Sequence, residues 1–267
     1  MLFRSANTLH DCESKIAVKC KIIGKDSWYG FRRIKFDFNG RTAWVVEPSV
    51  ATANGCPWTW TMQWADAFVD RTGVLDLLRQ GYHHVTIDLF DTRMNEEGLK
   101  TAAAFQEYLV KELGFAPKVN LVGMSWGGFF STRYAATYPD NVRKIYLDAP
   151  LLNFTRLYVK DPKQIGKVNP EMIGTWKMAA PMDHNWDNNP DMPINLAGKI
   201  AAAKIPVLLL YGGQDQTVAP EKNSEIFIER FKAAGGDIKV IKRNLFGHHP
   251  HGVDPDKTEP IVKFFAE

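Results

Sequence analysis

The sequence has 267 residues, of which 45% are hydrophobic and 24% are charged, and its net charge is +3. This composition is typical of a globular protein, and the length allows a sizeable core. Basic residues are scattered, which argues against a nucleic-acid partner, and no apolar run is long enough to span a membrane.

Three cysteines, Cys12, Cys20 and Cys56, are too few and too irregularly spaced for a disulfide framework or a zinc site. Free thiols and a cytoplasmic location are therefore the default expectation, with a bridge between Cys12 and Cys20 as the alternative. Residues 1–18 lack the apolar core of a signal peptide, although a precursor trimmed after export would look the same.

Hydrophobic periodicity predicts alternating strands and helices from about residue 34 onward, which is typical of a mostly parallel sheet covered on both faces. The two earliest strands are expected to be antiparallel. The predicted strands cover residues 32–39, 42–47, 83–89, 118–122, 144–148, 206–211 and 238–243. The predicted helices cover residues 64–79, 96–113, 128–138, 221–234 and 257–266.

One segment breaks this alternation. Residues 151–195 are rich in Pro, Asn, Asp and Met and show no strand pattern. Long irregular segments within a compact domain are usually functional. We therefore expect a single domain over residues 1–267, with a lid or cap insertion over about 151–200.

The motif Gly123-Met124-Ser125-Trp126-Gly127 lies between a predicted strand and a predicted helix. A serine between glycines at such a turn is typical of a nucleophile elbow, in which a strained backbone aims the hydroxyl out of the sheet. The motif alone is weak evidence, because a match arises by chance in about one chain in ten of this length.

A serine hydroxyl becomes a nucleophile when a base removes its proton, and the base needs an acid to orient it. Asp215 follows the strand at 206–211 in a glycine turn, and His248 follows the strand at 238–243. Both residues therefore belong to loops at the carboxyl ends of predicted strands. The chain order Ser125, Asp215, His248 predicts a nucleophile, an acid and a base.

Other residues are candidates for the same roles. Asp148 follows the preceding predicted strand and is the alternative acid, although a loop-structuring role is favoured for it. His249 and His251 are the alternatives to His248. The spacing of the three histidines is also compatible with a metal site, but Pro250 and the lack of a nearby cysteine or glutamate cluster argue against a metal.

Residues 42–265 resemble the α/β-hydrolase superfamily. The elbow, a G-x-x-D-x-x-V turn matched by Asp215 and Val218, and a late G-H-x-P-H loop matched by His248 follow one another in the order of that family. The resemblance implies an α/β-hydrolase fold with a mostly parallel central sheet flanked by helices. It also implies catalysis by Ser125, Asp215 and His248 without a metal or an organic cofactor.

Residues 57–60, Pro57-Trp58-Thr59-Trp60, together with a G-x-S-x-G-G elbow, resemble a narrower group of bacterial hydrolases. Those proteins carry Arg after the serine, where this chain has Trp126. An oxyanion hole normally uses two backbone N–H groups, one of them on the residue after the nucleophile, here Trp126. The resemblance assigns the second to residues 57–60, with Trp58 or Thr59 as the donor.

Tryptophan is abundant near these loops. The side chains expected to line a substrate pocket are Trp60, together with Trp176 and Trp186 in the insertion. Trp126 is a further candidate for the pocket. Trp64 is instead expected to pack in the core from one face of its predicted helix.

These residues predict a serine hydrolase that cleaves a carboxylic ester through an acyl-enzyme, on a small or carbohydrate-linked ester. The expected partner is this small-molecule substrate, with no nucleic acid and no membrane. Peptidases, thioesterases and acyltransferases use the same triad, so they remain alternatives, as does a non-catalytic binding module with the same fold. An aspartate nucleophile, as in dehalogenases and epoxide hydrolases, is excluded because Ser125 occupies the elbow.

Overall fold

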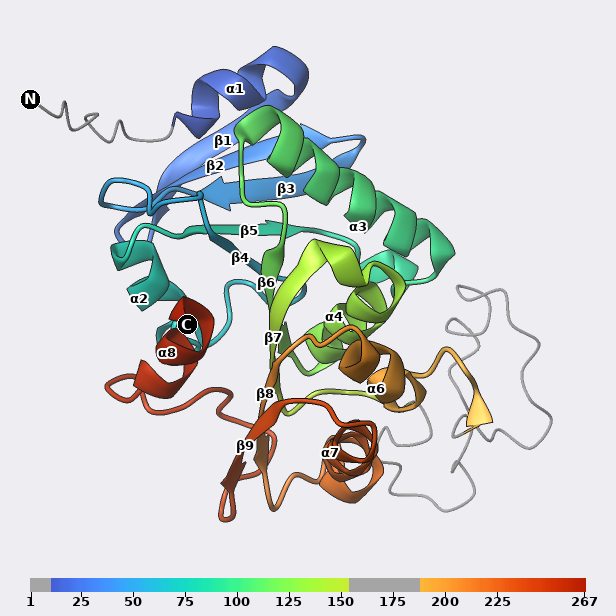
Figure 1. Cartoon of the computed structure of the whole chain (residues 1–267). Coiled ribbons are helices and arrows are strands. Elements are labelled where there is room, and N and C mark those ends of the chain that lie inside the picture. The colour runs from blue at the N-terminus through green and yellow to red at the C-terminus, as the bar shows by residue number, and fades with distance from the viewer. Residues whose placement is uncertain (1–10, 154–187) are drawn as a thin grey trace, which may run out of the picture.

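The computed structural model describes residues 11–153 and 188–267. Their strands form one nine-stranded sheet in the order β1-β2-β3-β5-β4-β6-β7-β8-β9, which runs through the centre of the molecule (Figure 1). The strands are β1 (Lys21–Trp28), β2 (Phe31–Phe38), β3 (Arg41–Val46), β4 (Trp58–Thr61), β5 (His83–Ile87), β6 (Val119–Met124), β7 (Val142–Asp148), β8 (Val207–Gly212) and β9 (Ile238–Arg243). The helices are α1 (Cys12–Lys19), α2 (Val74–Arg79), α3 (Glu96–Tyr108), α4 (Trp126–Thr137), α6 (Pro193–Ala202), α7 (Ser224–Ala233) and α8 (Glu259–Ala266).

The sheet begins antiparallel and continues parallel. Antiparallel pairs join β1 to β2, β2 to β3 and β3 to β5, and every pair from β5 through β4, β6, β7 and β8 to β9 is parallel. This confirms the predicted α/β class with an antiparallel start. Because parallel strands end at the same edge of a sheet, the loops after β4, β6, β7, β8 and β9 meet there.

Helices cover both faces of the sheet (Figure 1). Side chains of α1, α3, α4, α6 and α7 join one apolar cluster, and those of α2 and α8 join the other. In β8, Val207 and Leu209 belong to the first cluster, whereas Leu208 and Leu210 belong to the second. A strand covered on both faces has no polar side, which explains the continuous apolar runs in the sequence.

The sequence prediction missed β1 and β4. The four residues of β4 are all buried, and they pair with β5 on one side and β6 on the other. Residues 58–60 therefore lie within the sheet and not in a loop, and Pro57 directly precedes them. The chain leaves β4 at Met62, whose N–H donates to the carbonyl of Val122 at 3.3 Å.

The predicted helix over residues 64–79 is wrong except for its last part, α2. Trp64, Phe68 and Gly73 have φ values of 62°, 52° and 74°. Left-handed residues interrupt the i to i−4 hydrogen-bond ladder that a helix requires. Trp64 is consequently not a core residue, and 44% of it is exposed.

Part of the expected insertion over 151–200 belongs to the layer of helices on the sheet. Ile194 and Ile200 of α6 are fully buried in the first apolar cluster, and α6 contacts both α4 and α7. Residues 154–187 lie outside the described residues. Among the described helices, none is long and apolar enough to cross a membrane.

Candidate active site

The turn between β6 and α4 holds Ser125 in a strained conformation, with φ 49° and ψ −116°. Non-glycine residues rarely adopt a positive φ, and they keep it only where surrounding bonds impose it. Here the Ser125 N–H donates to the carbonyl of Asp148 at 3.0 Å, and its own carbonyl accepts from Gly128 and Leu151, each at 2.9 Å. The neighbouring strand and the following loop therefore hold the elbow in place.

Two glycines allow α4 to approach the strand at this turn. A Cβ on Gly123 would lie 2.8 Å from the carbonyl oxygen of Gly127, and a Cβ on Gly128 would lie 2.3 Å from the Cβ of Pro150. Both distances are too short for real atoms, so a side chain at either position would force the elbow apart. The glycine spacing around Ser125 follows from this close packing.

The structure brings the three predicted triad side chains together. The Nε2 atom of His248 lies 3.1 Å from the Oγ of Ser125, and its Nδ1 lies 2.7 Å from Oδ2 of Asp215. A carboxylate only accepts hydrogen bonds, so Nδ1 of His248 carries the proton and Nε2 is left as the acceptor for the serine hydroxyl. This arrangement can deprotonate a serine as it attacks a carbonyl.

The loop after β8 fixes the carboxylate of Asp215. Its Oδ1 accepts the backbone N–H groups of Thr217 and Val218, both at 2.8 Å, and leaves Oδ2 for His248. Asp215 is 5% exposed and His248 is 8% exposed. These three hydrogen bonds fix the orientation of the carboxylate, which is what an orienting acid requires.

A second aspartate–histidine pair lies beside the first. Asp148 accepts from Nδ1 of His251 at 2.8 Å, from the hydroxyl of Tyr146 at 2.5 Å and from the N–H of Gly252 at 2.6 Å. Asp148 is fully buried, and the ring centre of His251 is 4.8 Å from that of His248. Asp148 thus fastens the loop after β9 to β7, and its histidine is not the one that contacts Ser125.

A cavity of about 370 Å³ opens beside Ser125. Its described walls carry no Asp, Glu, Lys or Arg side chain. Partial desolvation, and then the neighbouring histidines, lower the pKa of His249, so this ring is neutral at neutral pH. The lining residues are Trp64, Ala67, Phe68, Met124, Ser125, Trp126, Leu151, Thr217, Val218, His248, His249 and His251.

The structure does not bring the expected second oxyanion donors to Ser125. Trp58 and Thr59 lie inside the sheet, where the Trp58 indole donates to the carbonyl of Ala116 at 2.8 Å and the Thr59 hydroxyl pairs with His84. Their strand was missed because four buried residues are too short to show a period.

The loop after β4 lies beside the first turn of α4 instead. A Cβ on Gly127 would lie 3.4 Å from the backbone nitrogen of Gln63, so this nitrogen is adjacent to the turn that follows Ser125. Trp126 opens α4, and its N–H points out of the N-terminal end of the helix. Sequence reasoning did not consider Gln63, because its position depends on where β4 ends and no local pattern marks that strand.

Trp60 is not a substrate-binding residue in this structure. It is 1% exposed, and its ring packs against Phe105 and Tyr134 at centroid distances of 5.3 and 5.5 Å. Trp176 and Trp186, the other two residues expected in the pocket, lie outside the described residues.

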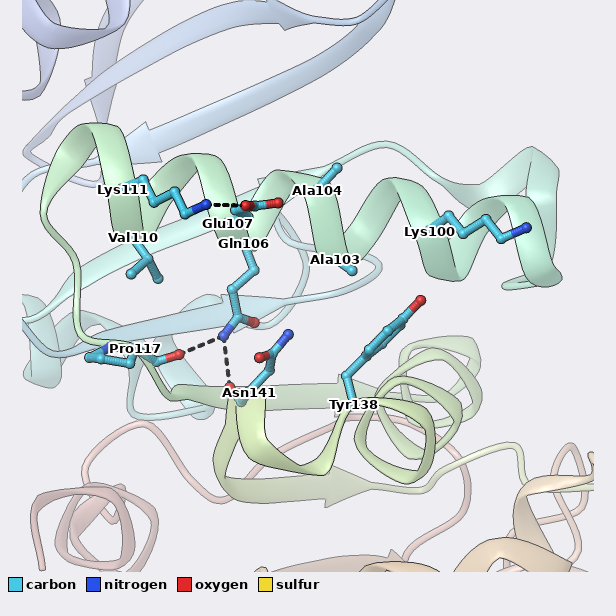
Figure 2. A pocket seen from close by; sticks show the side chains of 10 residues that line it. All are labelled: Lys100, Ala103, Ala104, Gln106, Glu107, Val110, Lys111, Pro117, Tyr138 and Asn141. Carbon is cyan, nitrogen blue, oxygen red and sulfur yellow. Dashed lines mark hydrogen bonds and ion pairs between the residues drawn. The ribbon is translucent and has the colours of Figure 1, made fainter.

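A second cavity, of about 510 Å³, lies between α3 and the loop before β6 (Figure 2). The side chain of Gln106 spans it by donating to the carbonyls of Pro117 and Asn141, both at 2.8 Å, and a Glu107–Lys111 ion pair stands at its edge. Its described walls contain no serine, cysteine or histidine. Of these two cavities, only the one beside Ser125 is lined by serine and histidine side chains among the described residues.

Comparisons with known proteins agree with this fold. A family model described as "alpha/beta hydrolase fold" matches residues 69–179. Among curated proteins, none matches the sequence. The family match and the strand order together show that the chain has the α/β-hydrolase fold.

Solved structures with the same fold include enzymes of several kinds. An S-formylglutathione hydrolase from Agrobacterium tumefaciens is 15% identical with a TM-score of 0.60, covering 92% of this chain and 95% of its own. Est1E from Butyrivibrio proteoclasticus is 18% identical with a TM-score of 0.60, covering 88% and 97%. The Pyrococcus horikoshii acylaminoacyl peptidase is 13% identical with a TM-score of 0.63, covering 93% of this chain, which spans only 49% of the peptidase.

Proposed function

We propose that this protein is a serine hydrolase that cleaves a carboxylic ester through an acyl-enzyme. The observation that carries the proposal is the hydrogen-bonded row from Ser125 through His248 to Asp215, with the serine at the wall of an apolar cavity. Three side chains that are far apart in the sequence converge here in the geometry that activates a serine.

In this mechanism, Oγ of Ser125 attacks the ester carbonyl while Nε2 of His248 takes its proton. The tetrahedral intermediate expels the alcohol, which receives that proton from His248. Water then attacks the acyl-enzyme while His248 takes its proton, and the carboxylic acid leaves as His248 returns that proton to Ser125. Asp215 remains ionised throughout, because its role is to hold Nδ1 of His248 and to stabilise the imidazolium.

The oxyanion that forms in each step is assigned to the backbone N–H groups of Trp126 and Gln63. This assignment replaces Trp58 and Thr59, which lie inside the sheet. It is supported by the adjacency of the Gln63 nitrogen to the first turn of α4. One such donor typically contributes about 3 kcal/mol to transition-state stabilisation.

The cavity favours a small, uncharged substrate. Its volume of about 370 Å³ is at the lower end of ligand pockets, and the rings of Trp64, Phe68 and Trp126 form part of its wall. A short or aromatic acyl group fits such a wall, and so does a sugar ring, which stacks on indole. The name of one full-length structural neighbour, an S-formylglutathione hydrolase, denotes hydrolysis of a thioester with a small formyl group, so thioesters belong in the substrate comparison.

A fluorophosphonate probe and a short p-nitrophenyl ester test the proposal. Wild type is expected to be labelled and to turn over the ester. Ser125→Ala should lose labelling, and both Ser125→Ala and His248→Ala should lower kcat by about 10⁴-fold or more. Ser131→Ala is the matched control, since Ser131 is fully buried in α4, the helix that follows Ser125.

The substrate class is tested with acetylated sugars, aryl esters, thioesters and peptides side by side. If the protein prefers a thioester or a peptide, the proposed triad still stands but the assignment to carboxylic esters is wrong. A wild-type protein that resists the probe and turns over none of these compounds would instead be a binding module with the hydrolase fold.

A further inference from the structure

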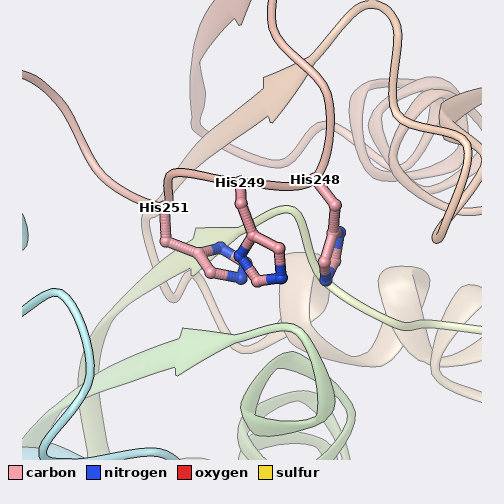
Figure 3. A group of neighbouring side chains, drawn as sticks. All are labelled: His248, His249 and His251. Atoms are coloured by element: carbon pink, nitrogen blue, oxygen red, sulfur yellow. The ribbon is translucent and has the colours of Figure 1, made fainter.

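Three histidines gather on the loop after β9, and each ring offers a nitrogen within 4.8 Å of the others (Figure 3). We propose that His248, His249 and His251 bind one Zn²⁺ ion, or another transition-metal ion that prefers imidazole, and that the bound ion blocks Ser125. The blocking effect rests on the proposed function, whereas the metal site does not.

Two of the three rings are already oriented as metal ligands. Asp215 accepts from Nδ1 of His248 at 2.7 Å, and Asp148 accepts from Nδ1 of His251 at 2.8 Å. Each carboxylate therefore fixes the proton on Nδ1 and leaves the lone pair on Nε2. Histidines that bind zinc commonly donate their other N–H to a carboxylate in this way, which raises their basicity and fixes the ring.

Asp148 is itself held rigidly. It is fully buried, and its second oxygen accepts from the hydroxyl of Tyr146 and the N–H of Gly252. The ester mechanism gives this carboxylate no task, because His251 does not contact Ser125. In a metal site Asp148 has a chemical role, because it orients the imidazole of His251 and raises its basicity.

His249 supplies the third ligand from the solvent side. Its ring lies 4.9 Å from that of His248 and 5.0 Å from that of His251, nearly perpendicular to both, and it stacks on Phe68. Zinc–nitrogen bonds of about 2.0–2.1 Å place tetrahedral ligands about 3.4 Å apart. The nitrogens must therefore draw together by up to about 1.4 Å, and the exposed ring of His249 is the one free to move.

A bound ion would compete directly with catalysis. All three rings line the cavity beside Ser125, so an ion that they hold would lie at the wall of the space that a substrate would occupy. Nε2 of His248 cannot bind a metal and accept the serine proton at the same time. Metal occupancy therefore removes the base from the triad.

Zinc binding is measured on the chelator-treated full chain by competition with a chromophoric chelator. Wild type and Ser125→Ala are both expected to bind one Zn²⁺ per chain with the same affinity. His249→Gln, at an exposed position, should bind about tenfold more weakly or worse. Asp148→Asn should lose about 10–100-fold in affinity, whereas Asp140→Asn, an exposed control, should lose none.

Added zinc should also lower ester turnover by the fraction of chains occupied, and EDTA should restore it. Zinc affinity that is unchanged in both His249→Gln and Asp148→Asn, or the absence of stoichiometric binding, would overturn the metal site. If Asp148→Asn fails to fold by circular dichroism, His249→Gln decides alone. If the protein binds zinc but the fluorophosphonate probe never labels it, the metal site stands and only the proposed function is overturned.

Discussion

At the scale of single residues, the carboxyl edge of the sheet carries two aspartates that each hold one histidine. Asp215 and Asp148 both accept an Nδ1–H from a buried imidazole at nearly the same distance. The pairs differ in what the opposite nitrogen reaches, since only the ring held by Asp215 contacts Ser125. In the proposed triad Asp215 is therefore the orienting acid, whereas Asp148 anchors the loop after β9 to β7.

Asp215→Asn is expected to lower kcat by about 10⁴-fold with little change in KM, because an amide can donate to His248 and stabilise the wrong tautomer. Asp148→Asn should instead lower the free energy of unfolding, because it weakens three buried hydrogen bonds. Steady-state kinetics and urea unfolding of both variants separate these effects. The reverse pattern would make Asp148 the acid.

The sequence prediction singled out Ser125, Asp215 and His248, whose side chains the structure brings into contact, because each stands in a short local pattern directly after an apolar strand. It failed for Trp58 and Thr59 because no local pattern marks a four-residue buried strand. The second oxyanion donor depends on where that strand ends, which is information about tertiary structure.

At the scale of elements, close approach of helices to the sheet decides which glycines are essential. Gly128 lies in the first turn of α4, where a Cβ would overlap Pro150, whereas a Cβ on Gly198 in α6 would meet nothing within 4 Å. Backbone conformation also explains why residues 64–79 do not form the single helix predicted for them. Its apolar residues are spaced as in a helix, but Gly73 and two other left-handed residues divide the segment.

Gly128→Ala is expected to destabilise the fold by about 1–3 kcal/mol and to displace the elbow, because the added methyl must push Pro150 away. Gly198→Ala, the matched control, should stabilise by about 0.5–1 kcal/mol, since alanine is the better residue in an open helical position. Urea unfolding measures both variants. Equal stabilities of the two would show that α4 does not pack closely on the loop after β7.

At the scale of the whole molecule, a sheet covered on both faces places polar side chains far from water. His84 in β5 is 1% exposed; its Nδ1 pairs with the hydroxyl of Thr59 at 2.8 Å, and its ring stacks on Trp28. Burial lowers the pKa of His84 from 6.5 to about 3. No composition or periodicity argument could locate this effect, because it depends on which strands surround β5.

The lowered pKa of His84 couples folding to pH. Below pH 6.5 the unfolded chain protonates this residue, but the folded protein does not until about pH 3, so stability falls as the pH falls through that window. Each pH unit below 6.5 lowers the free energy of unfolding by about 1.4 kcal/mol, so the loss at pH 5 is about 2 kcal/mol. Urea unfolding at about pH 7.5 and pH 5 should therefore show that wild type loses about 2 kcal/mol more than His84→Gln does. Carboxylates titrate alike in both proteins and cancel, so equal losses would mean that His84 accepts its proton inside the folded sheet.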